Sequence, residues 1–113
     1  YAKEKMNGAQ KMIGIGKWEA SINTMLFKGT GRVTISDNNG KYDFKLEIVG
    51  ENVPEFIVTD VIEDGNTLRA VAESDMFKGK KIPVTATFDK DIVVGTAKLP
   101  FIGNIKVKGH RID

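Results

Sequence analysis

Few residues of this chain are of a type that transfers protons or binds metals. The sequence has one histidine, His110, and no cysteine. A lone histidine close to the end of a chain is more often a surface residue than a general base. The absence of cysteine excludes disulfides, thiolate metal sites and cysteine nucleophiles. We therefore predict no catalytic residue, no metal site and no cofactor.

Carboxylates gather in the middle of the chain, where Asp60, Glu63 and Asp64 could bind a hard cation. Asp64 is followed by Gly65, and this pair is better explained as a tight turn. Asp60 is different, because it interrupts the apolar run of residues 56–62. If its side chain points inward, Asp60 is a candidate ligand contact. If it points outward, it is an ordinary strand carboxylate.

The charge balance argues against a nucleic-acid partner. The chain has 17 basic and 15 acidic side chains and a net charge of +2, which gives no electrostatic footprint for a polyanion. The most basic run, residues 78–81, fits a solvated hairpin turn, with a phosphate or an anionic lipid as the alternative contact. No apolar run approaches the ~18 residues of a membrane helix, so we predict no transmembrane segment.

Length and composition predict one domain that covers residues 1–113. Hydrophobic residues make up 41% and charged residues 28% of the chain, as in ordinary globular domains. The lack of cysteine is compatible with a reducing cytoplasm, and this is the location we predict. The chain begins at Tyr1 instead of methionine, which leaves open an exported or periplasmic location and an origin in a longer protein.

The first residues predict a short helix over residues 2–13. Apolar residues recur at helical spacing between Met6 and Ile13, and Gly14 and Gly16 would end the helix. Such a helix would act as a plug across one end of the molecule or, alternatively, as a lid.

From Trp18 onward the apolar period changes to two, which is typical of strands with one buried face. Residues 28–31, with two glycines, predict a turn after the first strand. Asn39-Gly40 and Asp64-Gly65 predict tight hairpins.

Two later segments add detail to this strand pattern. The clearest half-buried strand has its apolar residues at alternate positions: Tyr42, Phe44, Leu46 and Ile48. Residues 56–62 are apolar at nearly every position, which predicts a strand covered on both faces.

About eight short strands joined by hairpins predict an all-β, antiparallel fold. A parallel sheet is excluded, because its crossovers need a dozen or more residues. Two architectures remain, a closed up-and-down barrel and a two-sheet sandwich. The consecutive hairpins favour the barrel, which also removes exposed strand edges.

The residues Gly16-Lys17-Trp18 and the late Arg111 resemble the pattern of the calycin superfamily. In those proteins a Gly-x-Trp sequence opens the first strand, and a basic residue near the chain end packs across the tryptophan. The hairpin rhythm is similar to that of small lipocalin-like bacterial domains. The resemblance implies a β-barrel with Gly16, Trp18 and Arg111 as a structural signature.

The residues assigned to the inner face combine large aromatic side chains with small alanines. Such a barrel has room for side chains alone or for one small ligand. The candidate ligand-binding residues are Tyr42, Phe44, Phe56, Val58, Asp60, Leu68, Ala70, Val84 and Phe88.

These observations support three hypotheses for function. The first is non-enzymatic binding of a small hydrophobic or amphipathic molecule inside the barrel. The second is a structural or interaction domain with a filled interior. The third is a small barrel enzyme that uses Asp60, Glu73 or Tyr42 for proton transfer. Val71 and Val93, expected on the exposed faces of their strands, would allow a homodimer.

Overall fold

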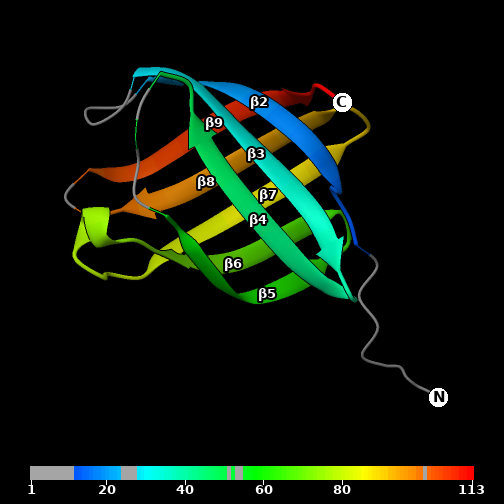
Figure 1. Cartoon of the computed structure of the whole chain (residues 1–113), viewed down its shortest axis with the longest axis horizontal. Coiled ribbons are helices and arrows are strands. Elements are labelled where there is room, and N and C mark those ends of the chain that lie inside the picture. The colour runs from blue at the N-terminus through cyan, green and yellow to red at the C-terminus, as the bar shows by residue number, and fades with distance from the viewer. Residues whose placement is uncertain (1–11, 24–27, 51, 53–54, 101) are drawn as a thin grey trace.

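The computed structural model describes residues 12–23, 28–50, 52, 55–100 and 102–113, and these residues form an all-β molecule (Figure 1). The strands are β2 (Gly16–Asn23), β3 (Lys28–Asn38), β4 (Lys41–Ile48), β5 (Ile57–Asp64), β6 (Thr67–Glu73), β7 (Ile82–Asp89), β8 (Ile92–Leu99) and β9 (Gly103–Arg111). A short 3-10 helix, η1 (Asp75–Phe77), joins β6 to β7. The expected helix over residues 2–13 lies almost wholly outside the described residues, and Ile13 and Gly14 form part of a turn.

The described strands form one eight-stranded antiparallel sheet in the order β4-β3-β2-β9-β8-β7-β6-β5. The sheet curls on itself because the first described strand, β2, pairs with the last, β9. The predicted up-and-down arrangement of about eight strands is therefore confirmed as a nearly closed barrel. Closure is incomplete between β4 and β5, which follow each other in the chain but form the two edges of the sheet. We call the space between these two edge strands the seam.

The register of the strands determines which side chains face the interior. Trp18 pairs with Val33, and Val33 pairs with Leu46, so one row of apolar side chains crosses three strands on the same face. Because side chains alternate along each strand, the apolar positions two residues away also face inward. The alternation of apolar residues in the sequence therefore determines which side chains face the interior of the barrel.

The predicted turn over residues 28–31 is wrong, because β3 begins at Lys28 and Asn23 pairs with Lys28. The two glycines have another role here. Gly29 has a φ of 146°, and a Cβ on Gly31 would lie 2.4 Å from the Ile22 Cδ1 atom. Gly29 therefore adopts a backbone conformation that favours glycine, and Gly31 leaves the space for Ile22, where the sequence pattern suggested a change of direction.

The prediction that residues 56–62 are covered on both faces is also wrong. A β-bulge interrupts the β5–β6 register between Thr59 and Ile62, and Asp60 within it has a positive φ of 56°. The bulge shifts the phase, so that both Ile57 and Ile62 point outward and are each 59% exposed. The run is apolar at nearly every position because the set of alternate residues that points inward changes at the bulge.

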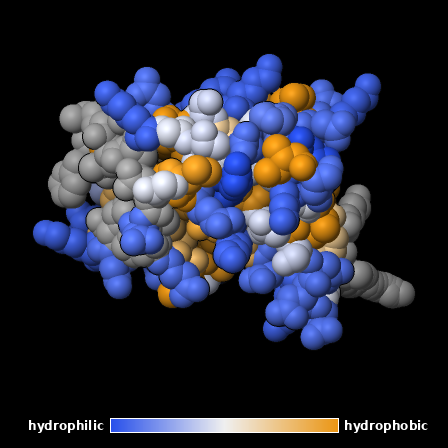
Figure 2. Space-filling model, turned by 45° about the horizontal axis from the view of Figure 1, so that its top comes forward, coloured by the Kyte–Doolittle hydropathy of each residue, from blue (hydrophilic) through white to orange (hydrophobic). Residues whose placement is uncertain are grey.

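Apolar side chains pack in two clusters along the barrel. The first contains Trp18, Ile35, Leu68 and Phe88, and the second contains Ala72, Phe77, Ile82 and Leu99. On the outside, the space-filling view shows apolar patches among hydrophilic side chains (Figure 2). Val93 packs against the first cluster, so its predicted place on the exposed face is wrong. Val71 does face outward, where it pairs with the exposed Thr59 and Pro83.

Candidate functional site

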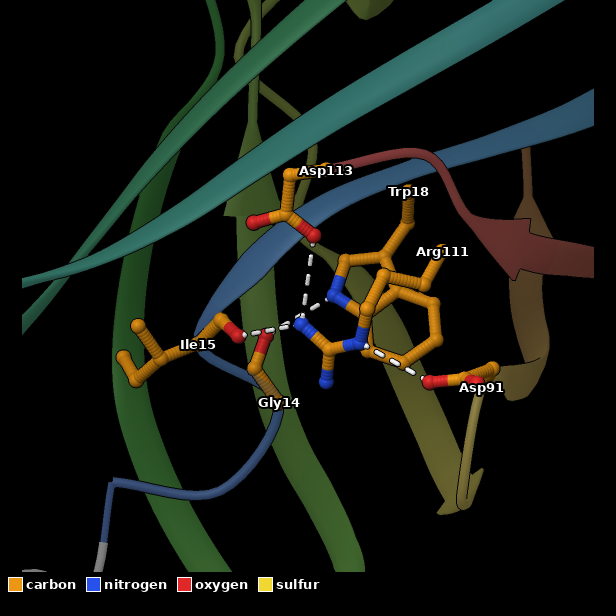
Figure 3. A network of polar contacts seen from close by, with 6 residues as sticks. All are labelled: Gly14, Ile15, Trp18, Asp91, Arg111 and Asp113. Carbon is orange, nitrogen blue, oxygen red and sulfur yellow. Dashed lines mark hydrogen bonds and ion pairs between the residues drawn. The ribbon is translucent and has the colours of Figure 1, made fainter.

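One end of the barrel is closed by Trp18, which is 1% exposed (Figure 3). Its indole Nε1 donates a hydrogen bond of 2.8 Å to the Gly14 carbonyl oxygen, so the polar atom of the buried ring is satisfied. The Phe88 ring lies 5.0 Å from the indole, centroid to centroid, at an angle of 56°. The Arg111 guanidinium carbon lies 4.4 Å from the Trp18 ring centroid, which is cation–π geometry.

Arg111 also links the segment that precedes β2 to the end of β9 beside the indole (Figure 3). Its Nη1 donates to the Ile15 carbonyl oxygen at 2.8 Å, and its Nε lies 3.2 Å from the Asp91 carboxylate. Gly16 leaves the space for this arrangement, since a Cβ there would lie 2.2 Å from Arg111 Nη1. Gly16, Trp18 and Arg111 therefore meet at one place, and their contacts hold this end of the barrel together.

The described residues line a cavity of about 300 Å³ inside the barrel. Thr85 is the one polar residue among those described as lining it, and its hydroxyl is 2.5 Å from that of Thr96. The wall includes aromatic, branched and small side chains, among them Phe44, Leu46 and Ile48 of β4, Leu68, Ala70 and Ala72 of β6, and Ile82, Val84, Ala86 and Phe88 of β7. Such a wall offers dispersion contacts and almost no hydrogen bonds.

Most of the candidate ligand-binding residues lie on this cavity. Those that line it are Phe44, Phe56, Val58, Leu68, Ala70, Val84 and Phe88. Asp60 is exposed in the β5 bulge. Tyr42 lies near the start of β4 and packs beside the Trp18 cluster. The structure thus brings the apolar candidates together and leaves the two polar ones outside the lining.

Tyr42 takes part in a polar cluster across the seam. Its hydroxyl donates a short hydrogen bond to the Glu63 carboxylate on β5. The Ile13 N–H donates to the Tyr42 oxygen at 2.7 Å, and the Met12 N–H donates to Glu63 Oε2 at 3.0 Å. Burial, and then the bond to Glu63, raises the pKa of the Tyr42 hydroxyl above its ordinary value. The phenol therefore stays protonated and serves as a donor.

The sequence placed Glu63 only among the carboxylates that could bind a hard cation, and the contact with Tyr42 was missed. Glu63 pairs with Leu68, whose side chain is buried inside the barrel, so Glu63 faces the same side. The missed signal is the β5 bulge, because without the phase shift Glu63 would point outward. Phe77, Leu99 and Ile105, which were not among the candidate residues, line the other end of the cavity. Leu99 and Ile105 lie on β8 and β9 and follow the alternating pattern, whereas Phe77 lies on η1, whose place beside the cavity is not evident from that pattern.

The described residues contain no group of three or more histidine, cysteine or acidic side chains that could hold a metal ion. They also contain no helix of the length and apolar character needed to cross a membrane.

Comparisons of the chain with protein-family models, with curated proteins and with solved structures returned no match. The architecture is compatible with a calycin-like fold, since it is an antiparallel, nearly closed barrel of eight strands.

Proposed function

We propose that this protein is a lipocalin-like binding protein that holds a small hydrophobic or amphipathic molecule inside its barrel. The observation that carries the proposal is the cavity of about 300 Å³ with its apolar wall. Ligand sites are typically concave and mostly apolar, with volumes of roughly 300–1,000 Å³. A filled barrel, the alternative, would leave no such volume.

The size of the cavity limits the ligand. An apolar cavity of about 150 Å³ stays dry and accepts benzene. A cavity twice as large has room for roughly a dozen carbon atoms. Any polar end of an amphipathic ligand must reach solvent, because the wall supplies no charged group among its described residues.

The positions of the polar candidates favour binding over catalysis. Asp60 is exposed, Glu73 pairs with Ile57 on the outer face, and the Tyr42 hydroxyl is engaged with Glu63. A general acid or base must lie within hydrogen-bond reach of the reacting atoms. None of these three residues belongs to the described wall of the cavity.

The proposal is tested with the neutral fluorophore 1-naphthylamine, which is small enough for the cavity and whose emission moves to shorter wavelengths in apolar surroundings. Ala70→Phe introduces a ring into the cavity, whereas Val71→Phe places the same ring on the outer face of the same strand. Loss of about half of the volume should weaken probe binding by about tenfold or more in A70F. V71F should bind like the unmodified protein.

Equal binding by A70F and V71F, or no binding by the unmodified protein, would contradict the proposal. Near-ultraviolet circular dichroism of both variants checks that each retains its packed core.

A further inference from the structure

The seam runs beside the cavity. On β4, the residues Phe44, Leu46 and Ile48 line the cavity, and on β5 Val58 lines it. These two strands are the edges of the described sheet, so no ladder of backbone hydrogen bonds joins them within the described residues. The cavity wall is therefore continuous around the barrel except along this line.

Leu46 indicates where the cavity reaches solvent. Its pairing with Val33 turns the side chain inward, and it lines the cavity. Even so, Leu46 is 38% exposed, whereas Ile48, two residues further along the same face, is 6% exposed. Because β3 covers one flank of β4, the exposure of Leu46 arises on the side of the seam. The opening thus lies in the wall of the barrel, in the second half of β4.

The seam is held at one end by Tyr42 and Glu63, which we call the clasp. The clasp joins β4 to β5 by a side-chain hydrogen bond and ties both strands to the backbone N–H groups of Met12 and Ile13. Its position beside the Trp18 cluster places it at the closed end of the barrel. At the other end of the seam the chain itself passes from β4 to β5.

Exposed apolar side chains gather on both flanks of the seam. Four of the large hydrophobic residues that are exposed lie on or directly beside the two edge strands: Leu46, Val49, Ile57 and Ile62. The charged residues that point outward are Lys41, Asp43, Lys45 and Glu47 on β4 and Asp60 and Asp64 on β5, so acidic side chains outnumber basic ones. An approaching apolar molecule gains contacts here, and the excess of carboxylates disfavours anions.

We infer that ligands pass between solvent and the cavity through the seam at Leu46, and that the clasp sets how far β4 and β5 separate. This inference rests on the proposed function. Neighbouring strands elsewhere in the described sheet share ladder hydrogen bonds, each of which opposes separation. β4 and β5 can part without breaking such a ladder, so the barrel opens there most readily. Tyr42 and Glu63 are positioning residues in this scheme.

The route is measured by labelling a thiol inside the cavity. The chain has no cysteine, so Ala70→Cys introduces a unique thiol on the cavity wall. The reagent is the neutral benzyl methanethiosulfonate, and the rate of labelling reports access. L46W, added to A70C, should slow labelling by narrowing the opening. I102W, at the opposite barrel end and outside the described wall, should leave the rate unchanged within error.

The clasp is tested in the same A70C protein. Y42F removes the hydroxyl and should accelerate labelling by about fivefold, as expected for one lost hydrogen bond. T87V is the matched control, because it removes the 2.8 Å contact between the hydroxyls of Thr67 and Thr87 on two strands that remain paired. Its labelling rate should stay that of A70C.

Slower labelling in I102W than in L46W would overturn the inference and assign access to the barrel end. Equal rates in Y42F and T87V would remove the role of the clasp. If L46W fails to fold, L46F makes the same comparison with a smaller side chain. Labelling needs no bound ligand, so seam-dependent labelling without probe binding would remove the proposed function alone. Seam-independent labelling with probe binding would remove this inference alone.

Discussion

Arg111 stabilises the barrel end because one guanidinium meets several partners at once. It lies over the Trp18 ring and donates to the Ile15 carbonyl oxygen. We expect Arg111→Met to lower the free energy of unfolding by about 2–4 kcal/mol, the sum of a cation–π contact and a charged hydrogen bond. Denaturant unfolding followed by the fluorescence of Trp18 measures this loss and reports the changed surroundings of the indole.

The matched control is Arg69→Met, which removes an ion pair of 3.4 Å to Asp64. Both partners of that pair are exposed, and such pairs contribute less than about 1 kcal/mol. A loss in R111M no larger than in R69M would show that the contacts around Trp18 do not stabilise the fold.

The clasp joins two elements, β4 and β5, and its contribution to stability should depend on pH. The hydrogen bond from Tyr42 to Glu63 should contribute about 1–3 kcal/mol at neutral pH. The pKa of the Tyr42 hydroxyl is raised in the folded protein, so the unfolded chain loses this proton first, near pH 10. Above that pH, loss of the proton stabilises the unfolded chain relative to the folded protein, so the contribution of Tyr42 to stability falls as the pH rises.

The measurement is the difference in free energy of unfolding between the unmodified protein and Tyr42→Phe, taken from pH 7 to pH 11. We expect the difference to be constant below about pH 10 and to shrink above it. Lysines titrate in both proteins, so their effect cancels in the difference. T87V, which lacks a titrating group, should show a difference that does not change with pH. A Y42F difference that grows with pH would contradict the assigned role of the hydroxyl.

Individual elements were predictable where local pattern determines them. The alternation in residues 42–48 predicted the inner face of β4, and all seven apolar candidates line the cavity. β5 was not predictable in the same way, because its bulge depends on Asp60 adopting a positive φ. Aspartate tolerates a positive φ, but an aspartate in a sequence does not by itself predict that conformation. The Tyr42–Glu63 contact was hidden for the same reason.

The whole barrel was predictable from strand number and hairpins, but its seam was not. Consecutive strands usually pair, and the connection from β4 to β5 is no longer than the one from β6 to β7, which do pair. The break is visible only in the order of the complete sheet, in which β2 pairs with β9 while β4 and β5 form the two edges. The cavity is likewise a property of the whole molecule. The same alternating faces fill a narrow barrel and leave space in a wider one.

An empty apolar cavity has a cost for the whole molecule, because the side chains around it lack partners for dispersion contacts. Ala86 lines the cavity, and Ala86→Val adds two carbon atoms in a residue that favours strands. We expect A86V to raise the free energy of unfolding by about 1 kcal/mol in the absence of ligand. Ser21→Val adds bulk at an exposed position of β2 and should change stability by less than about 0.5 kcal/mol. Urea unfolding of both variants measures the two effects. A packed interior would instead make A86V destabilising by about 1–3 kcal/mol, and that result would show that the barrel has no room for a ligand.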